Sequence, residues 1–150
     1  MPPEPSPHSI RRATTVAELL AAGPLFDSPA REEWARRFLA APGHHLFLAH
    51  ADGAAVGFIT GIEMLHPDKG VEMCLYELGV AGPYRRRGIA RALISELVTL
   101  SKELGCYDMW VGVDLDNDAA LAAYRSTGAR DDDGGVGCAI LTWEFRAPAG

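Results

Sequence analysis

The sequence is poor in cysteine and has no excess of positive charge. Its 150 residues include three cysteines, Cys74, Cys106 and Cys138. Their odd number and wide spacing argue against a disulfide framework or a thiolate metal site, so we expect free thiols and no metal. Lys and Arg number 14 against 20 Asp and Glu, which gives a net charge of −6. A general nucleic-acid binder needs surplus cations to displace counterions, so we exclude nucleic acid as a partner.

Long apolar runs are also missing. No stretch approaches the length needed to span a bilayer, so we expect no membrane association. The first nine residues, MPPEPSPHS, lack the apolar core of a secretory signal. The sequence therefore predicts a cytoplasmic protein. Hydrophobic residues make up 48% of the chain, which suits one globular domain. We place that domain at 10–146, between a disordered N-terminal tail at 1–9 and a C-terminal tail at 147–150.

Hydrophobic periodicity predicts a mixed α/β or α+β domain, with alternating runs as strands and 3.6-residue spacing as helices. An Asp-Gly pair at 52–53 predicts a tight hairpin turn, and a Gly-Pro pair at 23–24 predicts a break in the first helix. Ser28 is expected to cap the second helix, whose apolar stripe is Trp34, Phe38 and Leu39. The expected strands are 9–14, 44–52, 54–65, 71–81, 107–115 and 135–145, and the expected helices are 15–26, 28–41, 88–104 and 116–128.

One strand-to-helix junction concentrates positive charge. Arg85, Arg86 and Arg87 lead directly into Gly88, and Arg91 follows in the first helical turn. A helix N-terminus exposes unpaired N–H groups and a positive dipole end, and glycine lets an anion approach the main chain. The pattern favours a pyrophosphate site, and the alternative is a loop glycine beside solvated arginines. A Walker loop is excluded because no Gly-Lys-Ser/Thr sequence occurs, and a dinucleotide fingerprint because its second and third glycines are missing.

The segment Arg85–Ala90 resembles the acetyl-CoA signature of Gcn5-related N-acetyltransferases (GNAT), in which a basic residue or Gln is followed by two variable residues and then by Gly-x-Gly/Ala. A second motif has that family's spacing at Asn117, Ala120, Tyr124 and Gly128. The resemblance implies an N-acetyltransferase with a central, mostly antiparallel sheet and flanking helices. It also implies that acetyl-CoA lies in the splay between the fourth and fifth strands.

The same resemblance implies how the coenzyme is held. Main-chain groups of Leu78 and Val80 would bond the pantetheine arm, and Asn117 would lie near that arm. The residues alone favour a role for Asn117 as a helix N-cap. The implied coenzyme-binding residues are Leu78, Gly79, Val80, Arg85, Arg86, Arg87, Gly88, Ile89, Ala90, Asn117 and Tyr124.

Acetyl transfer to an amine needs a base, because an alkylamine with a pKa near ~10 is mostly protonated at neutral pH. Family members often place an acid on the strand before the loop, which by resemblance makes Glu77 the general base. Glu72 on the same strand is the reserve. Tyr124 would by resemblance protonate the leaving thiolate. The alternatives are a strand-edge glutamate paired with an arginine and an ordinary core tyrosine.

A closer resemblance concerns the acceptor. The segments YELGVAGPYRRRGIARALI, AAVGFITGIEML and DNDAALAAY resemble aminoglycoside 3-N-acetyltransferases of type I. This resemblance implies that Glu77 and Asp114, with Glu72 in reserve, bind ammonium groups of the sugar. It also implies a homodimer. Those enzymes have Asp at the position of Glu77, so the carboxylate here is one methylene longer. The alternatives are a GNAT enzyme acting on a peptide, lysine or polyamine amine, and an acetyl-CoA-binding sensor without turnover.

Overall fold

The computed structural model describes residues 7–131 and 139–145 of the chain. It separates into two compact units, Met1–Gly112 and Val113–Gly150, and each is described by itself. The expected tails at 1–9 and 147–150 lie largely outside the described residues, and β1 already begins at Ser9. The bounds of the expected domain therefore stay a prediction.

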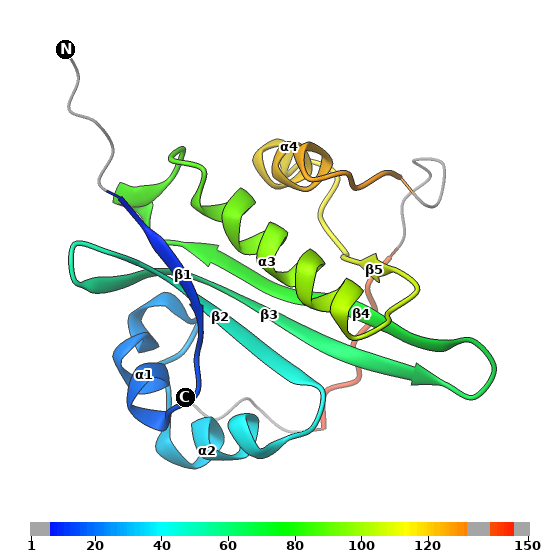
Figure 1. Ribbon diagram of the computed structural model, residues 1–150, viewed down its shortest axis with the longest axis horizontal. Helices are drawn as coiled ribbons and strands as arrows, with labels where there is room; N and C mark the ends of the chain where they lie inside the picture. Colours follow the sequence, from blue (N-terminus) through cyan, green and yellow to red (C-terminus); the bar gives the residue numbers. More distant parts are fainter. Residues whose placement is uncertain (1–6, 132–138, 146–150) are drawn as a thin grey trace. The chain divides into compact units, whose positions relative to one another are not determined.

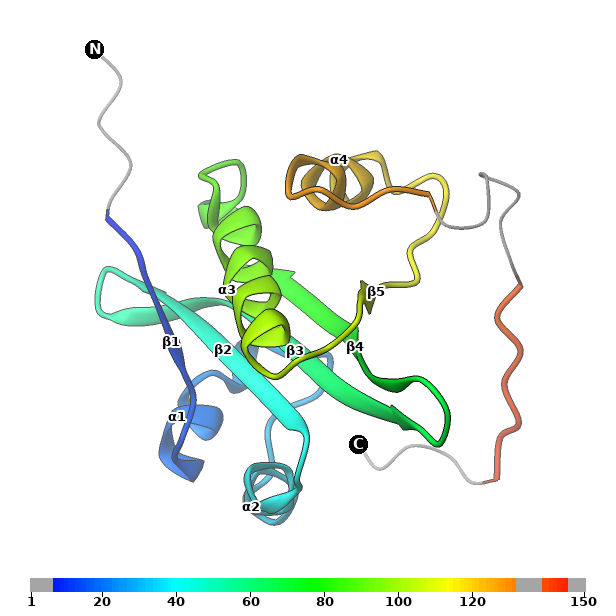
Figure 2. The same ribbon diagram turned by 45° about the vertical axis from the view of Figure 1, so that its right-hand side comes forward.

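The first unit is built on a five-stranded sheet in the order β1-β2-β3-β4-β5. The first four strands pair antiparallel, and β5 pairs parallel with β4 (Figure 1). Helices α1 and α2 lie on one face, and α3 crosses the other (Figures 1 and 2). The elements are β1 (Ser9–Arg12), α1 (Val16–Ala21), the 3-10 turn η1 (Gly23–Leu25), α2 (Glu32–Ala40), β2 (His44–Ala51), β3 (Ala54–His66), β4 (Gly70–Val80), the 3-10 turn η2 (Gly82–Tyr84), α3 (Ile89–Glu103) and β5 (Met109–Trp110).

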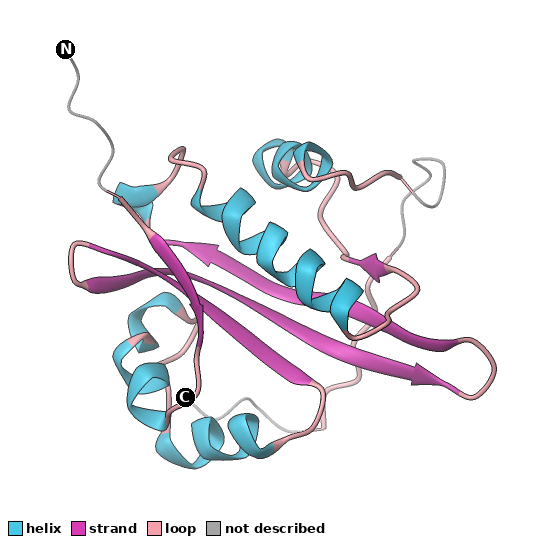
Figure 3. Ribbon diagram, in the orientation of Figure 1, coloured by secondary structure: helices cyan, strands magenta, loops and turns pink. Residues whose placement is uncertain are grey.

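This architecture confirms the expected α+β class, the hairpin at Asp52–Gly53 and the break at Gly23–Pro24. Two strand predictions fail. The expected strand 107–115 is reduced to Met109–Trp110. The expected last strand covers 135–145, of which 139–145 are described and form no strand (Figure 3). A strand persists only through a ladder to a neighbour, and alternation of apolar residues does not supply that partner.

Helix α2 begins later than expected, and two of the three residues of its expected apolar stripe, Phe38 and Leu39, pack against the core. Its N-cap is Arg31, without a side-chain cap, in place of Ser28. Ala30 instead packs against η1, with its N atom 3.3 Å from where a Cβ on Gly23 would lie, and Glu32 is the first helical residue. The buried residue of α2 is Ala35, whereas Trp34 is 46% exposed and carries the Arg37 guanidinium 4.6 Å from its ring centroid.

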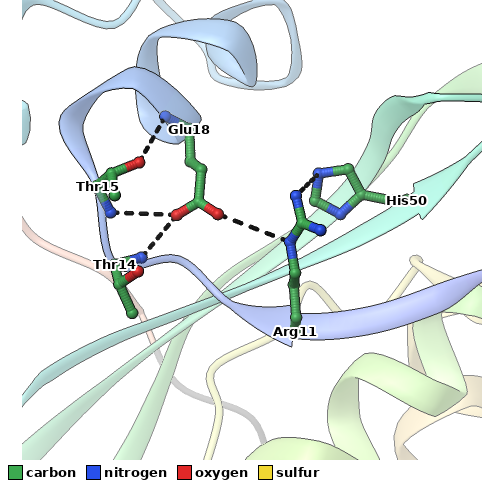
Figure 4. A network of polar contacts seen from close by, with 5 residues as sticks. All are labelled: Arg11, Thr14, Thr15, Glu18 and His50. Carbon is green, nitrogen blue, oxygen red and sulfur yellow. Dashed lines mark hydrogen bonds and ion pairs between the residues drawn. The ribbon is translucent and has the colours of Figure 1, made fainter.

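A polar network fixes α1 to the first strands (Figure 4). Thr15 caps the helix by accepting from the Glu18 N–H, and the Glu18 carboxylate accepts from the N–H groups of Thr14 and Thr15 at 2.8 and 3.1 Å. These bonds, those to the main chain of Thr14 first, lower the pKa of Glu18. Arg11 reaches Glu18 at 3.6 Å and the His50 ring at 3.5 Å. The start of α1 is thereby tied to both β1 and β2.

The core has one layer on each face of the sheet. Between the sheet and the helices α1 and α2, the buried cluster includes Leu19, Ala22, Ala35, Leu46, Leu48 and Phe58. Under α3, Gly57 and Gly61 of β3 let the helix approach closely. A Cβ on Gly61 would lie 2.6 Å from Leu97 Cδ1, and one on Gly57 would lie 3.2 Å from Ile89 Cγ2. Burial of a leucine side chain such as Leu97 stabilises the fold by about 1.5–3 kcal/mol. This close fit therefore fixes α3 against the sheet.

The second unit contains α4 (Asp118–Ser126), which confirms the expected helix. Asn117 is its N-cap and accepts from the Ala120 N–H at 3.1 Å. Gly128 follows the helix with a φ of 103°, the left-handed conformation typical of a helix stop. Asp114 lies in the turn before α4, where its carbonyl accepts from the Asn117 N–H at 3.0 Å.

Candidate functional site

A register shift in β4 decides which residue of the Tyr-Glu-Leu segment faces the α1–α2 side. Thr60 of β3 pairs with Glu77, but the next β3 residue, Gly61, pairs with Leu75. Tyr76 is therefore the extra residue of a bulge. The buried Thr60 hydroxyl accepts the Glu77 N–H at 3.0 Å, which secures the main chain just after the bulge.

The faces of β4 follow from those of β3. Phe58 belongs to the core under α1 and α2, and Thr60 lies two residues along on the same face. Directly opposed residues share a face, so Glu77, opposite Thr60, and Gly79, opposite Phe58, lie on the α1–α2 side. Gly79 has a packing role as well: a Cβ there would lie 2.7 Å from Phe58 Cε1.

Asp27 lies near Glu77, and sequence reasoning missed it. The Phe26 ring packs edge-on against Phe58 at a centroid distance of 4.8 Å, which brings the chain after η1 onto the face that Glu77 occupies. Partial burial of the carboxyl raises the pKa of Glu77, although the residue as a whole is exposed, and the Asp27 carboxylate raises it further. No local pattern could have linked two acids so far apart in the chain.

Glu72, the reserve, has a different environment. Its carboxylate contacts His66 Nε2 at 2.8 Å. Hydrogen bonding to His66, and to a smaller extent to Asp108 and Tyr107, lowers the pKa of Glu72. By contrast, no hydrogen bond or ion pair to the Glu77 carboxylate occurs among the described residues. A free carboxylate with a raised pKa accepts a proton more readily than one already bonded, so Glu77 is the better base of the two.

Beyond the bulge, β4 extends past its neighbour. The ladder to β5 consists of Met73–Met109 and Cys74–Trp110 in the described residues, whereas β4 continues to Val80. The stretch Leu75–Val80 pairs with β3 on its other side. This geometry leaves a strand edge to which an extended ligand can add main-chain hydrogen bonds, as the predicted pantetheine contacts of Leu78 and Val80 require.

The arginine-rich loop begins in a well-defined turn. The Ala81 N–H donates to the Val56 carbonyl at 2.8 Å, and the Arg85 Nε donates to the Val80 carbonyl at 3.1 Å. After this, Arg86 and Gly88 both have left-handed backbones, with φ of 63° and 79°. Such a conformation is unusual for a residue other than glycine, Asn or Asp, and is therefore a distinctive feature of this loop.

This loop suits a pyrophosphate. Gly88 is the N-cap of α3, no side chain caps the helix, and its first turn has no acidic residue. A Cβ on Gly88 would meet nothing within 4 Å, so an anion can approach the main chain. The ion pairs of the described residues include none of the surrounding cations, all of which are exposed: Arg85, Arg86, Arg87 and Arg91. Ile89 is buried against β3 and Ala90 is half-buried, so both hold the helix in place.

The remaining predicted residues belong to the second unit. Tyr124 of α4 is half-buried, and burial raises the pKa of its phenol, which therefore keeps its proton at neutral pH. Asn117 is the cap of α4, and Asp114 and Asp116 are exposed in the preceding turn. Tyr124, Asn117 and Asp114 thus belong to a different unit from Glu77.

Other chemistry has little support in the parts of the chain that are described. Residues 7–131 and 139–145 contain no group of three or more His, Cys, Asp or Glu side chains able to hold a metal ion. Cys74 is buried and Cys106 half-buried, both as free thiols, and Cys138 lies outside the described residues. No described helix is long and apolar enough to cross a membrane.

The family is decided by a match over most of the chain. Residues 13–129 match the model of the acetyltransferase (GNAT) family. The chain belongs to this family. It is an acetyl-CoA-dependent N-acetyltransferase, which confirms the expected family, enzyme class and cosubstrate.

Individual relatives are named for different acceptors. The N-alpha-acetyltransferase RimI of Mycobacterium tuberculosis is 37% identical over 77% of this chain and 71% of its own length. An aminoglycoside acetyltransferase from an uncultured soil metagenomic sample is 26% identical, with a TM-score of 0.73 over 95% of this chain and 99% of its own. The aminoglycoside N-acetyltransferase AAC(6')-Iy, solved with coenzyme A, is 21% identical, with a TM-score of 0.72 over 93% of this chain and all of its own. None of these three is a 3-N enzyme by name.

The contact between Thr60 and Glu77 makes a testable prediction. Thr60→Val keeps the shape but leaves the Glu77 N–H without its acceptor, so the free energy of unfolding should fall by about 1–3 kcal/mol. Thr60→Ser, which keeps the hydroxyl, is the matched control. Urea unfolding of both variants measures the difference, and equal stability would show that the hydroxyl does not hold the bulge.

Proposed function

We propose that this enzyme transfers the acetyl group of acetyl-CoA to an amine of an aminoglycoside, at the 3-N position. The observation that carries the proposal is the free Glu77 carboxylate beside Asp27 on the α1–α2 face of β4. Two unpaired carboxylates attract a polycationic amine and raise its rate of encounter. Support also comes from the 26% identical aminoglycoside acetyltransferase and from the resemblance to type I 3-N enzymes.

Glu77 acts as the general base. An amine bound near it arrives as an ammonium ion and must lose a proton before it can attack the thioester carbonyl. The raised pKa brings the carboxylate closer to the ammonium in basicity, which favours this transfer. Asp27 remains as a counter-charge for the other ammonium groups, and Asp114 and Glu72 are the further acceptor contacts that we propose.

The coenzyme lies along the edge of β4 and over the start of α3. Acetyl-CoA supplies the activated acetyl thioester. Leu78 and Val80 bond its pantetheine arm through their main chains, with Gly79 between them and Asn117 near the arm. The pyrophosphate meets the N–H groups at Gly88, Ile89 and Ala90. Arg85, Arg86 and Arg87 surround that site with charge. Tyr124, whose phenol keeps its proton at neutral pH, donates it to the departing thiolate.

A second acceptor has its own support. The 37% identity with RimI covers 77% of the chain and favours the N-terminal amine of a protein. A peptide acceptor presents one ammonium group, whereas an aminoglycoside presents several. The two functions therefore differ in how strongly they depend on Asp27.

Release of the coenzyme A thiol, measured with an acceptor panel, separates them. We expect turnover with gentamicin, sisomicin and fortimicin, acetylation at the 3-N position by NMR of the product, and little turnover with alanine-initiated peptides or spermidine. Asp27→Asn should raise the KM for the aminoglycoside and leave the KM for acetyl-CoA unchanged. Turnover confined to peptides, or insensitive to Asp27, would contradict the aminoglycoside proposal.

The base assignment predicts opposite effects on rate and stability. Glu77→Gln should lower kcat/KM at neutral pH by about 100- to 10,000-fold, with a smaller deficit at high pH, where the amine deprotonates in solution. Because the fold raises the pKa of Glu77, ionisation of this group destabilises the folded state above that pKa. The variant should therefore be more stable than the native protein at neutral pH, and this gain should vanish in acid.

Glu103→Gln is the matched control, because Glu103 is an exposed glutamate in the last turn of α3. It should change neither the rate nor the pH profile. A Glu77→Gln variant with the native rate would remove Glu77 as the base, whatever its stability.

The phosphate loop is tested by adding a side chain at Gly88. Asn tolerates the left-handed conformation, so Gly88→Asn should fold normally while its side chain occupies the space left for the anion. We expect the Kd for coenzyme A, measured by calorimetry, to rise about tenfold or more, equivalent to ~1.4 kcal/mol. Gly105→Asn is the control, because Gly105 has a φ of 78° and open space at the other end of α3. Equal affinities in the two variants would contradict the loop assignment.

A further inference from the structure

Asp52 and Tyr84 join two turns that are distant in the sequence. Tyr84 ends the η2 turn that leads into the arginine-rich loop, and Asp52 begins the tight turn between β2 and β3. The Tyr84 hydroxyl donates a hydrogen bond to Asp52 Oδ2 at 2.8 Å. The turn between β2 and β3 therefore holds the phenol ring of Tyr84, the residue directly before Arg85.

The ring of Tyr84 in turn contacts Arg87. The guanidinium carbon lies 5.1 Å from the ring centroid, within the range of a cation–π interaction. Arg87 directly precedes Gly88, so its orientation bears on the start of α3. No hydrogen bond or ion pair of the Arg87 side chain occurs among the described residues, which makes this ring its principal contact there.

The three groups influence one another electrostatically. The hydrogen bond to Asp52 is the main cause that raises the pKa of Tyr84, and Arg87 acts in the opposite direction. A carboxylate without a nearby cation would repel an anionic ligand from this loop. Here it is occupied by the Tyr84 hydroxyl, and the cation stacked on that ring balances its charge.

We propose that Asp52 and Tyr84 are positioning residues for the coenzyme's phosphates: the Asp52–Tyr84 hydrogen bond fixes the ring on which Arg87 rests, and so keeps Arg87 oriented beside Gly88. The inference rests on the phosphate role proposed for the Arg85–Ala90 loop. The left-handed backbone of Arg86 supports it, because such a conformation persists only where the surroundings hold it. The main chain secures the loop up to Arg85, and the Asp52–Tyr84–Arg87 contacts continue that support toward Gly88.

The test uses four variants that separate the hydrogen bond, the ring and the charge. Tyr84→Phe keeps the ring and removes the hydroxyl, whereas Tyr84→Leu removes both. Asp52→Gly removes the carboxylate and tolerates the positive φ of 52°. Asp52→Asn keeps an acceptor oxygen and the turn but removes the charge. Asp68→Asn is the control for the loss of one negative charge. Asp68 lies in the turn between β3 and β4, at the other end of β3 from Asp52.

We expect Tyr84→Phe and Asp52→Gly each to raise the Kd for coenzyme A about three- to tenfold, the usual range for the loss of one ordinary hydrogen bond. The double variant should be no worse than either single one, because both remove the same bond. Tyr84→Leu should be weaker still, and Asp52→Asn and Asp68→Asn should stay near the native affinity. The kcat at saturating acetyl-CoA and the KM for the acceptor should not change.

A spectroscopic readout distinguishes positioning from general damage. In a tyrosinate absorbance titration, Asp52→Gly should lower the pKa of the tyrosine that Tyr84→Phe removes. Native coenzyme affinity in both Tyr84→Phe and Asp52→Gly, beside weak binding by Gly88→Asn, would overturn the inference and leave the loop assignment standing. Native affinity in Gly88→Asn as well would overturn the loop assignment, and the inference with it.

Discussion

The bulge at Tyr76 is the constraint on which the candidate site depends. In a regular ladder, Tyr76 would stand opposite Thr60, and every later residue of β4 would change face. With the bulge, Glu77 takes that position, Gly79 meets the Phe58 ring, and β4 reaches Val80 in register with Gly57. A single extra residue thus directs both the carboxylate and the strand edge that leads to the arginine-rich loop.

The first unit separates opposite charges between the α1–α2 face of β4 and the loop that follows this strand. The carboxylates of Glu77 and Asp27 lie on the α1–α2 face, and the cluster of exposed arginines follows within a few residues of the end of β4. This distribution would let a protein with a net charge of −6 accommodate a polyanion at the proposed phosphate site. Helix α3 adds its N-terminal N–H groups to the arginines, and the close fit over Gly57 and Gly61 fixes where those groups lie.

Local patterns in the sequence were sufficient for the parts that depend on local geometry. The Asp-Gly hairpin, the helix from Gly88 to Gly105 and the Asn117 cap all follow from the conformational preferences of a few neighbouring residues. Resemblance to the GNAT family added the cosubstrate and the roles proposed for Glu77 and Tyr124. Neither source indicated the bulge, because the apolar residues near the end of 71–81 fall on both faces, so a change of face leaves no mark in the pattern.

Contacts between residues far apart in the chain could not be predicted from local sequence patterns either. Asp27 lies near Glu77 because Phe26 packs on Phe58. Asp52 contacts Tyr84 because the turn between β2 and β3 lies next to the η2 turn. The late start of α2 accompanies another such contact, in which Ala30 packs on Gly23 instead of entering the helix. The expected last strand shows the converse limit: alternating apolar residues in 139–145 do not specify a partner.

The most direct test is the pKa of Glu77 itself. Carbon-13 NMR of the glutamate carboxyls, assigned with Glu77→Gln, should give a midpoint above the ordinary value of about 4.3, and this midpoint should fall in Asp27→Asn. That result would establish the neighbouring, partly desolvated carboxylates that make Glu77 a base and attract a polycation. A midpoint at or below the ordinary value, unchanged by Asp27→Asn, would contradict both.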